Sequence, residues 1–193
     1  MIRSFMAIEL PEAFHAEIER LRVRLKSAGA DVKWVRPAGV HLTLKFLGDV
    51  LEDTIGPLAR AAAEAVAPHP PLTLSLNGLG VFPGPSQPRV VWVGLAGDLA
   101  ALDALRLDLE AAAAKFGFAP EKRPFKPHLT LGRVRSNRGR AELIACLGRL
   151  EVEPLSFTAG EVIYFKSDLK PSGAEYTALH RLPLEGGKRE EPS

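Results

Sequence analysis

Cysteine is almost absent from this sequence of 193 residues. Cys146 is the single example, so the chain cannot form an internal disulfide bond. The cysteine and histidine spacing of a zinc finger is missing for the same reason. A chain that makes no use of disulfides fits a reducing compartment, and we therefore expect a cytoplasmic protein.

Long apolar runs are also lacking. No stretch reaches the roughly 20 apolar residues that a membrane-spanning helix needs, so we expect no membrane partner. The opening MIRSFMAIELPEAF has a short apolar run broken by Glu9 and Pro11, which is a poor match to a signal peptide. The phosphate-binding pattern G-x-x-x-x-G-K-[ST] does not occur, which argues against nucleotide-driven chemistry.

Neither sign of charge is in excess. The 25 basic and 23 acidic residues leave a formal net charge of +2, so composition alone does not demand a nucleic-acid partner. At 46% hydrophobic residues the chain has the composition of an ordinary globular protein. We expect a single bilobal domain over 1–185, a flexible tail over 186–193, and a monomer.

The tetrapeptide HLTL is present twice, at 41–44 and at 128–131. The elements predicted around the two copies follow one order: strand, helix, HLTL strand, helix, strand. One of these helices is expected to begin after Asp98, which would cap it. The shared order indicates an internal duplication, roughly 1–88 and 89–184. We predict an α+β fold of two lobes, each an antiparallel sheet backed by two helices, with a pseudo-twofold axis and a central catalytic cleft.

Each HLTL strand is expected to present histidine and threonine on one face. Residues two apart in a strand point the same way, so the leucines point into the core. His41, Thr43, His128 and Thr130 would then surround one small volume. Two imidazoles can take and give a proton near neutral pH, and two hydroxyls can donate to an anionic oxygen. A phosphodiester fits this arrangement.

These motifs and their flanks resemble a known family. Two H-x-T/S-x motifs at about this separation mark the 2H phosphoesterases. The segments RSFMAIELP, VRPAGVHLTLKFLGDV, GLGVFPGPSQPRVVWVGL, FKPHLTLGRVR and SDLKPSGAEYTALHRLPL are similar to those of RNA 2′,3′-cyclic phosphodiesterases, formerly called 2′-5′ RNA ligases. The resemblance covers nearly the whole chain. It implies a bilobal fold with the site in a central groove, a 2′,3′-cyclic phosphate RNA end as partner, and no metal or other cofactor.

The resemblance also implies roles for the motif residues. His128 would accept a proton from the attacking water, and His41 would donate one to the departing 3′ oxygen, leaving a 2′-phosphate. Thr43 and Thr130 would hold the phosphate oxygens as negative charge builds. The residues themselves do not assign donor and acceptor, because the two halves are too similar.

Basic and aromatic residues near the motifs are candidates for binding substrate. By strand alternation Lys45 shares the catalytic face, whereas Arg133 does so only if a bulge at Gly132 turns it. The further candidates for an RNA groove are Arg89, Arg123, Lys126, Arg135 and, for stacking on a base, Phe46, Phe125 and Trp92. Trp92 lies in an apolar strand, which favours core packing, and Phe5 is expected in the core too. Tyr176 is a weaker groove candidate, and His15, His69 and His180 are expected to be non-catalytic.

Three other functions remain to be weighed. A zinc site needs three or four ligands, and the two motifs supply only two histidines with no matched carboxylate or cysteine. A non-catalytic RNA-binding module would explain the basic and aromatic residues but not the duplicated histidines. Ligation is the same chemistry run backwards, with a 5′-hydroxyl in place of water.

Overall fold

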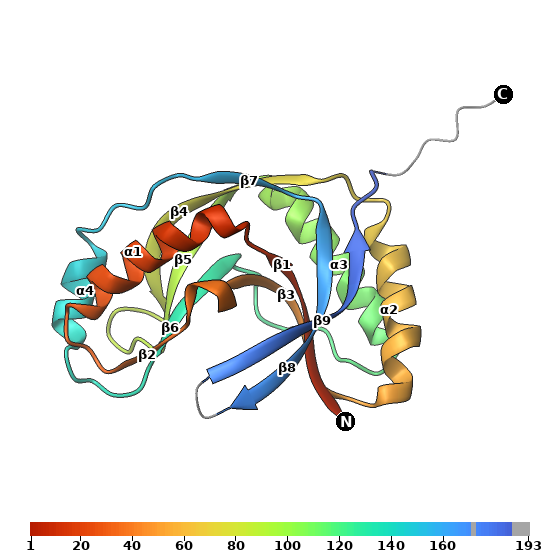
Figure 1. Cartoon of the computed structure of the whole chain (residues 1–193), viewed down its shortest axis with the longest axis horizontal. Helices are drawn as coiled ribbons and strands as arrows, with labels where there is room; N and C mark the ends of the chain where they lie inside the picture. The colour runs from red at the N-terminus through yellow and green to blue at the C-terminus, as the bar shows by residue number, and fades with distance from the viewer. Residues whose placement is uncertain (171–172, 187–193) are drawn as a thin grey trace.

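The computed structural model describes residues 1–170 and 173–186 and contains two antiparallel sheets (Figure 1). The four-stranded sheet has the order β3-β1-β8-β9, with bounds β1 Ile2–Glu9, β3 His41–Val50, β8 Glu161–Lys170 and β9 Gly173–Pro183. The five-stranded sheet has the order β2-β6-β5-β4-β7, with bounds β2 Val32–Trp34, β4 Leu72–Phe82, β5 Val90–Gly97, β6 His128–Val134 and β7 Ser156–Ala159. The two HLTL strands, β3 and β6, therefore belong to different sheets.

Each sheet is backed by two helices. Figure 1 shows α2 (Glu52–Val66) and α3 (Leu99–Ala114) beside the four-stranded sheet, and α1 (His15–Lys26) and α4 (Arg140–Leu147) beside the other. Short 3-10 helices precede α1 and β3, at Glu12–Phe14 (η1) and Pro37–Gly39 (η2). The predicted α+β architecture of two antiparallel sheets, each backed by helices, is confirmed.

The two sheets repeat one strand order. When the five-stranded sheet is laid on the four-stranded one, β6, β5, β4 and β7 take the places of β3, β1, β8 and β9. From the sequence we expected each lobe to be one half of the chain. The structure differs from this expectation. The first half contributes β4 to the five-stranded sheet and the second contributes β8 to the other, so the halves exchange strands. The alternation of apolar and polar residues in a strand indicates which face is buried but not which strand lies beside it. The exchange of β4 and β8 could therefore not be predicted from the sequence.

The edge strand β2 joins the two sheets. Trp34 pairs with Gly132 of β6, and the amide of Val35 donates to the carbonyl of Leu131 over 2.8 Å. The chain then passes through η2 and enters β3 at His41. Only five residues separate the hydrogen bond on one HLTL strand from the first residue of the other.

One apolar core runs through both lobes. It contains the leucines of both HLTL motifs, which are buried as predicted: Leu42, Leu44, Leu129 and Leu131. A second, smaller cluster lies on the opposite face of the four-stranded sheet and consists of Phe5, Ala7, Ile163 and Phe165, with Tyr176 packed against it. Phe5 is thus buried as expected, but on the side of the sheet that carries His41.

Asp98 precedes α3 as predicted, but its carboxylate does not cap the helix. It accepts a hydrogen bond from the amide of Thr73 on β4 over 2.7 Å, and the backbone carbonyl of Asp98 accepts from Leu102. The cap residue therefore ties α3 to the neighbouring sheet.

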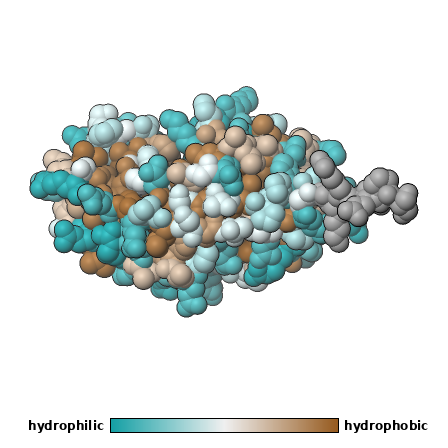
Figure 2. All heavy atoms as spheres, turned by 90° about the horizontal axis from the view of Figure 1, so that it is seen from above, coloured by the Kyte–Doolittle hydropathy of each residue, from teal (hydrophilic) through white to brown (hydrophobic). Residues whose placement is uncertain are grey.

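The surface, the helices and the end of the described chain relate to the expectations of no membrane span and of a flexible tail. Figure 2 shows polar and apolar side chains interspersed on the face that carries β7 and α1. No helix among the described residues combines the length and hydropathy needed to cross a bilayer. Of the predicted tail, Gly186 donates its amide to His69, and residues 187–193 lie outside the described part of the chain.

Candidate active site

The two histidines have the same local geometry. His41 opens β3, and its Nδ1 lies 3.0 Å from the carbonyl oxygen of Gly39. His128 opens β6, and its Nδ1 lies 2.6 Å from the carbonyl oxygen of Lys126. A carbonyl can only accept, so Nδ1 carries the hydrogen in both rings. The neutral tautomer therefore leaves Nε2 of each ring free to accept a proton.

Burial keeps both imidazoles neutral. It lowers the pKa of His41 to about 4, and the hydrogen bond to Gly39 only partly offsets this effect. Burial also lowers the pKa of His128, against the effect of the Lys126 carbonyl, and the positive charge of Arg133 lowers it further. Both rings of the free protein are thus poised as proton acceptors near pH 7.

Aromatic rings hold each imidazole in place. The His41 ring stacks on Phe5 with centroids 4.7 Å apart, and Tyr176 meets it edge-on at 5.1 Å. The His128 ring meets Phe82 edge-on at 4.9 Å. Sequence reasoning missed Phe82, which lies 46 residues before His128 and reaches it through the pairing of β4, β5 and β6. Phe5 was within reach of sequence reasoning, because period-two alternation along β1 places Phe5 and Ala7 on one face and the core residues Met6 and Ile8 on the other.

A bulge moves Lys45 away from the site. Ala7 pairs with Thr43 and Met6 with Lys45, so Leu44 is an extra residue in β3. Lys45 consequently points into the core, where it is 5% exposed, and Phe46 takes the face of Thr43, where it is 66% exposed. The expectation that Lys45 shares the catalytic face is wrong, because alternation fails across a bulge.

Lys45 instead forms a buried ion pair. Its ammonium lies 2.5 Å from Oε2 of Glu110 on α3 and donates to the carbonyl of Ala119 over 2.7 Å. Glu110 is 5% exposed. The pair ties β3 to α3 and to the segment that leads into His128.

A matching bulge turns Arg133 toward the site. Trp92 pairs with Thr130 and Val91 with Gly132, so Leu131 is the extra residue in β6. The predicted irregularity is present beside Gly132, and Arg133 lies on the face of Thr130. Its charge acts on His128 and also on Tyr176 of the other sheet, whose pKa burial raises and Arg133 lowers. Arg133 therefore lies where the two lobes meet.

The other predicted substrate-binding residues are spread around this region. Lys126 lies 5.8 Å from the centroid of Phe82, and Phe125 packs against the core with the guanidinium of Arg106 5.0 Å from its centroid. Arg89 and Arg135 are exposed. Arg123 forms an ion pair with Glu121 at 2.8 Å.

We call the faces of the two sheets that carry Thr43 and Thr130 the cleft face. Trp92 lies on this face, not in the core as its apolar strand suggested. It shares the face of Thr130, and a Cβ atom on Gly80 would fall 2.2 Å from its ring. The indole therefore lies flat over β4. Its Nε1 is buried, and no described residue accepts its hydrogen.

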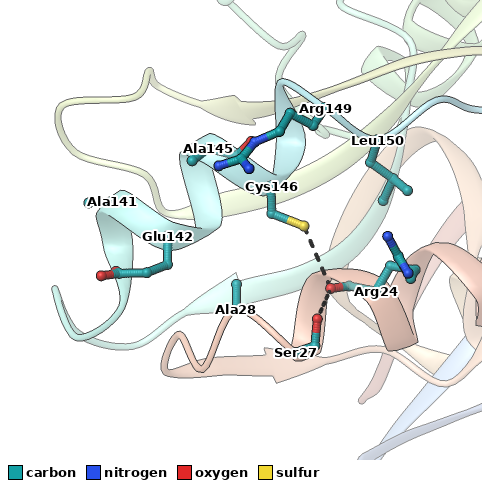
Figure 3. Close-up of a pocket in the computed structure, with 9 residues that line it drawn as sticks. All are labelled: Arg24, Ser27, Ala28, Ala141, Glu142, Ala145, Cys146, Arg149 and Leu150. Atoms are coloured by element: carbon teal, nitrogen blue, oxygen red, sulfur yellow. Dashed lines mark hydrogen bonds between the residues drawn. The ribbon is translucent and has the colours of Figure 1, made fainter.

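A pocket is also present beside the five-stranded sheet, away from the histidines. Figure 3 shows it between α1 and α4, with Arg24, Glu142, Cys146 and Arg149 around it. Cys146 and Ser27 both donate to the carbonyl of Arg24. None of the residues that line this pocket lies on β3 or β6, so the pocket is separate from the predicted catalytic residues.

The donor set for a metal is small. Among residues 1–170 and 173–186 there is no group of three or more His, Cys, Asp or Glu side chains arranged to hold an ion. A metal-free reaction stays a prediction.

Comparison with known proteins identifies the family. A model of the 2′-5′ RNA ligase superfamily matches residues 10–171. The chain belongs to this superfamily. The match spans both HLTL strands, the whole five-stranded sheet, and strands β3 and β8 of the other sheet.

Several superfamily members are similar over their full length. An RNA 2′,3′-cyclic phosphodiesterase of Methanothermobacter thermautotrophicus is 39% identical over 95% of this chain and 99% of its own. The crystal structure of TT0787 of Thermus thermophilus has a TM-score of 0.79 at 26% identity and covers 96% of this chain and 99% of its own. The structure of E. coli LigT complexed with 3′-AMP has a TM-score of 0.76 at 28% identity and covers 95% and 98%.

Replacing Lys45 with methionine should lower the free energy of unfolding by about 3 kcal/mol, because the buried carboxylate of Glu110 then loses its closest cation and keeps only Arg106, at 3.8 Å. The double variant Lys45→Met/Glu110→Leu should regain most of this loss. Urea denaturation monitored by circular dichroism measures both. A single variant as stable as the wild type would show that the pair is not formed.

The low pKa of His41 should make stability depend on pH. The ring has a pKa of about 4 in the folded state and about 6.5 when unfolded, so between these values only the unfolded chain binds the proton. Stability is therefore full above about pH 6.5 and falls as the pH is lowered toward 4, by about 2 kcal/mol between pH 7 and pH 5. Urea titrations at both pH values should show this loss, and His41→Asn should reduce it. An unchanged pH dependence in the variant would contradict the burial of the ring.

Proposed function

We propose that this protein hydrolyses RNA ends that carry a 2′,3′-cyclic phosphate, leaving a 2′-phosphate. The observation that carries the proposal is the duplicated geometry. Two imidazoles hold Nδ1 on a local carbonyl and leave Nε2 free, and each is followed two residues later by a threonine on the same face. The relatives named RNA 2′,3′-cyclic phosphodiesterase support the substrate class.

In the proposed reaction, His128 takes a proton from water while the water oxygen bonds to phosphorus. The bond between phosphorus and the 3′ oxygen breaks, and His41 gives that oxygen a proton. Thr43 and Thr130 donate hydrogen bonds to the non-bridging oxygens as their charge grows. No metal or other cofactor takes part. The proton taken by His128 and the proton given by His41 balance over one turnover.

The low pKa of His41 places a condition on this assignment. A ring with a pKa of about 4 is neutral at pH 7 in the free protein, so it cannot donate a proton until something stabilises its charged form. The anionic cyclic phosphate supplies that stabilisation, because a neighbouring negative charge raises the pKa of an imidazole. We therefore propose that His41 gains its proton together with the substrate.

The residues proposed to bind the rest of the substrate divide by chemistry. Arg133 and Lys126 provide positive charge close to His128, and Arg89 lies immediately before β5 of the same sheet. Phe46 provides an exposed ring on the face of Thr43, and a base can stack on such a ring. Phe125 lies mainly under Arg106, so we assign it a supporting role. Lys45 is excluded because it is buried in its ion pair.

Ligation is the reverse of this reaction, with a 5′-hydroxyl of a second RNA in place of water. The alternative of a different class is a module that binds RNA without chemistry. It accounts for the basic and aromatic side chains, but it does not account for two partly buried imidazoles with matched hydrogen bonds.

Incubation of an RNA ending in a 2′,3′-cyclic phosphate should yield a 2′-phosphate end, with or without excess EDTA. Mapping the terminal phosphate by mass spectrometry and phosphatase digestion measures the product. Binding of the RNA without conversion would favour the non-catalytic module. Loss of turnover in EDTA that zinc or manganese restores would overturn the metal-free mechanism.

Each single variant, His41→Ala or His128→Ala, should lose roughly 10²–10⁴ in rate on the RNA substrate. A nitrophenyl phosphodiester needs no protonation of its leaving oxygen. It should therefore partly restore the rate of His41→Ala and leave His128→Ala inactive. Steady-state kinetics on both substrates tests this. The reverse pattern would exchange the two roles, and full activity of both variants would remove acid–base catalysis by this pair.

A further inference from the structure

A pair of positive charges lies on the cleft face of strands β2 and β6. Lys33 pairs in register with Arg133, and Arg133 pairs on its other side with Val90 of β5. Residues paired in register point to the same face of a sheet, so Lys33 shares the face of Arg133 and Thr130. The neighbours of Lys33 point the other way, since a Cβ on Gly132 would meet Val32 at 2.6 Å and Trp34 at 3.0 Å.

Neither cation is neutralised by the described chain. Within residues 1–170 and 173–186, Lys33 and Arg133 form no ion pair with a carboxylate. Like charges directly opposite on adjacent strands destabilise a sheet. The arrangement is thus unfavourable within the protein alone and becomes favourable when an anion binds between the two side chains.

This row of charge lies close to the proposed reaction centre. Arg133 is the next residue of β6 on the cleft face after Thr130. The usual rise of a strand places it about 7 Å farther along. Arg133 lies near both His128 and Tyr176, as its effect on both groups indicates. Lys33 extends the positive surface outward from that point, toward the edge of the five-stranded sheet.

The rim on the other lobe has a different character. There the cleft face carries the exposed ring of Phe46 and the aromatic cluster around Phe5 and Tyr176. A nucleotide chain with its terminal phosphate at the threonines has a base to place on an apolar surface and a further phosphate to place on a basic one. The row of Lys33 and Arg133 offers the second beside Thr130, whereas the exposed Arg3 on the face of Phe5 lies in register with Asp49.

We propose that Lys33 and Arg133 form a subsite for the phosphodiester that joins the terminal nucleoside to its 5′ neighbour. The inference rests on the proposed function and specifies its substrate. The enzyme acts on chains of two or more nucleotides more efficiently than on a cyclic mononucleotide, which lacks this phosphodiester.

Three substrates and two variants test the subsite. The substrates are a nucleoside 2′,3′-cyclic phosphate with a free 5′-hydroxyl, a dinucleotide with the same cyclic end, and that dinucleotide with an uncharged methylphosphonate linkage. The variants are Lys33→Met and the matched control Lys115→Met, which removes one charge from an exposed residue at the end of α3. Initial rates at low substrate give kcat/KM for each combination.

In the wild type, kcat/KM should be highest for the charged dinucleotide. Lys33→Met should lower it roughly 5- to 10-fold on that substrate and leave it unchanged on the mononucleotide and the methylphosphonate. The slope of log kcat/KM against log salt on the charged dinucleotide should decrease by about one. Lys115→Met should match the wild type throughout.

Two outcomes would overturn the subsite while leaving the proposed function intact: equal rates of the wild type on charged and uncharged dinucleotides, or an equal loss in Lys33→Met on all three substrates. Failure of the wild type to hydrolyse any of the three would instead remove the proposed function, and the subsite with it.

Discussion

The placement of the two histidines depends on the exchange of strands between the lobes. Each sheet takes strands from both halves of the chain, and one apolar core runs through both. The hydrogen bond from Val35 to Leu131 ties the end of β2 to β6, and only five residues then separate Val35 from His41 on β3. A relative movement of the lobes would disturb the shared core. The histidines are thus held by the backbone of a single domain, which suits a reaction that needs a proton donor and a proton acceptor at defined positions.

The local parts of the site were predictable from the sequence. Period-two alternation places His41 with Thr43 and His128 with Thr130, and it buries the four leucines. The order of elements around each motif led to two sheets and four helices. The catalytic roles of these residues are proposed from this geometry.

The parts that were missed depend on contacts between strands. A glycine pointed to the irregularity that turns Arg133, whereas no residue pointed to the extra Leu44 that buries Lys45. Phe82 meets His128 across two intervening strand pairings, and Trp92 faces the cleft because Gly80 leaves space for its ring. In each case the deciding information is the register between neighbours, which a single strand does not contain.

The two bulges make equivalent positions of the duplicated strands chemically different. Phe46 and Arg133 each lie five residues after their histidine, and each is turned onto the cleft face by one extra leucine. The backbone of the site is therefore nearly symmetric, whereas its side chains are not: one half presents a neutral ring and the other a fixed positive charge. A molecule with two different ends has only one favourable direction in such a site. The difference between Phe46 and Arg133 thus gives a nearly symmetric backbone a chemical direction.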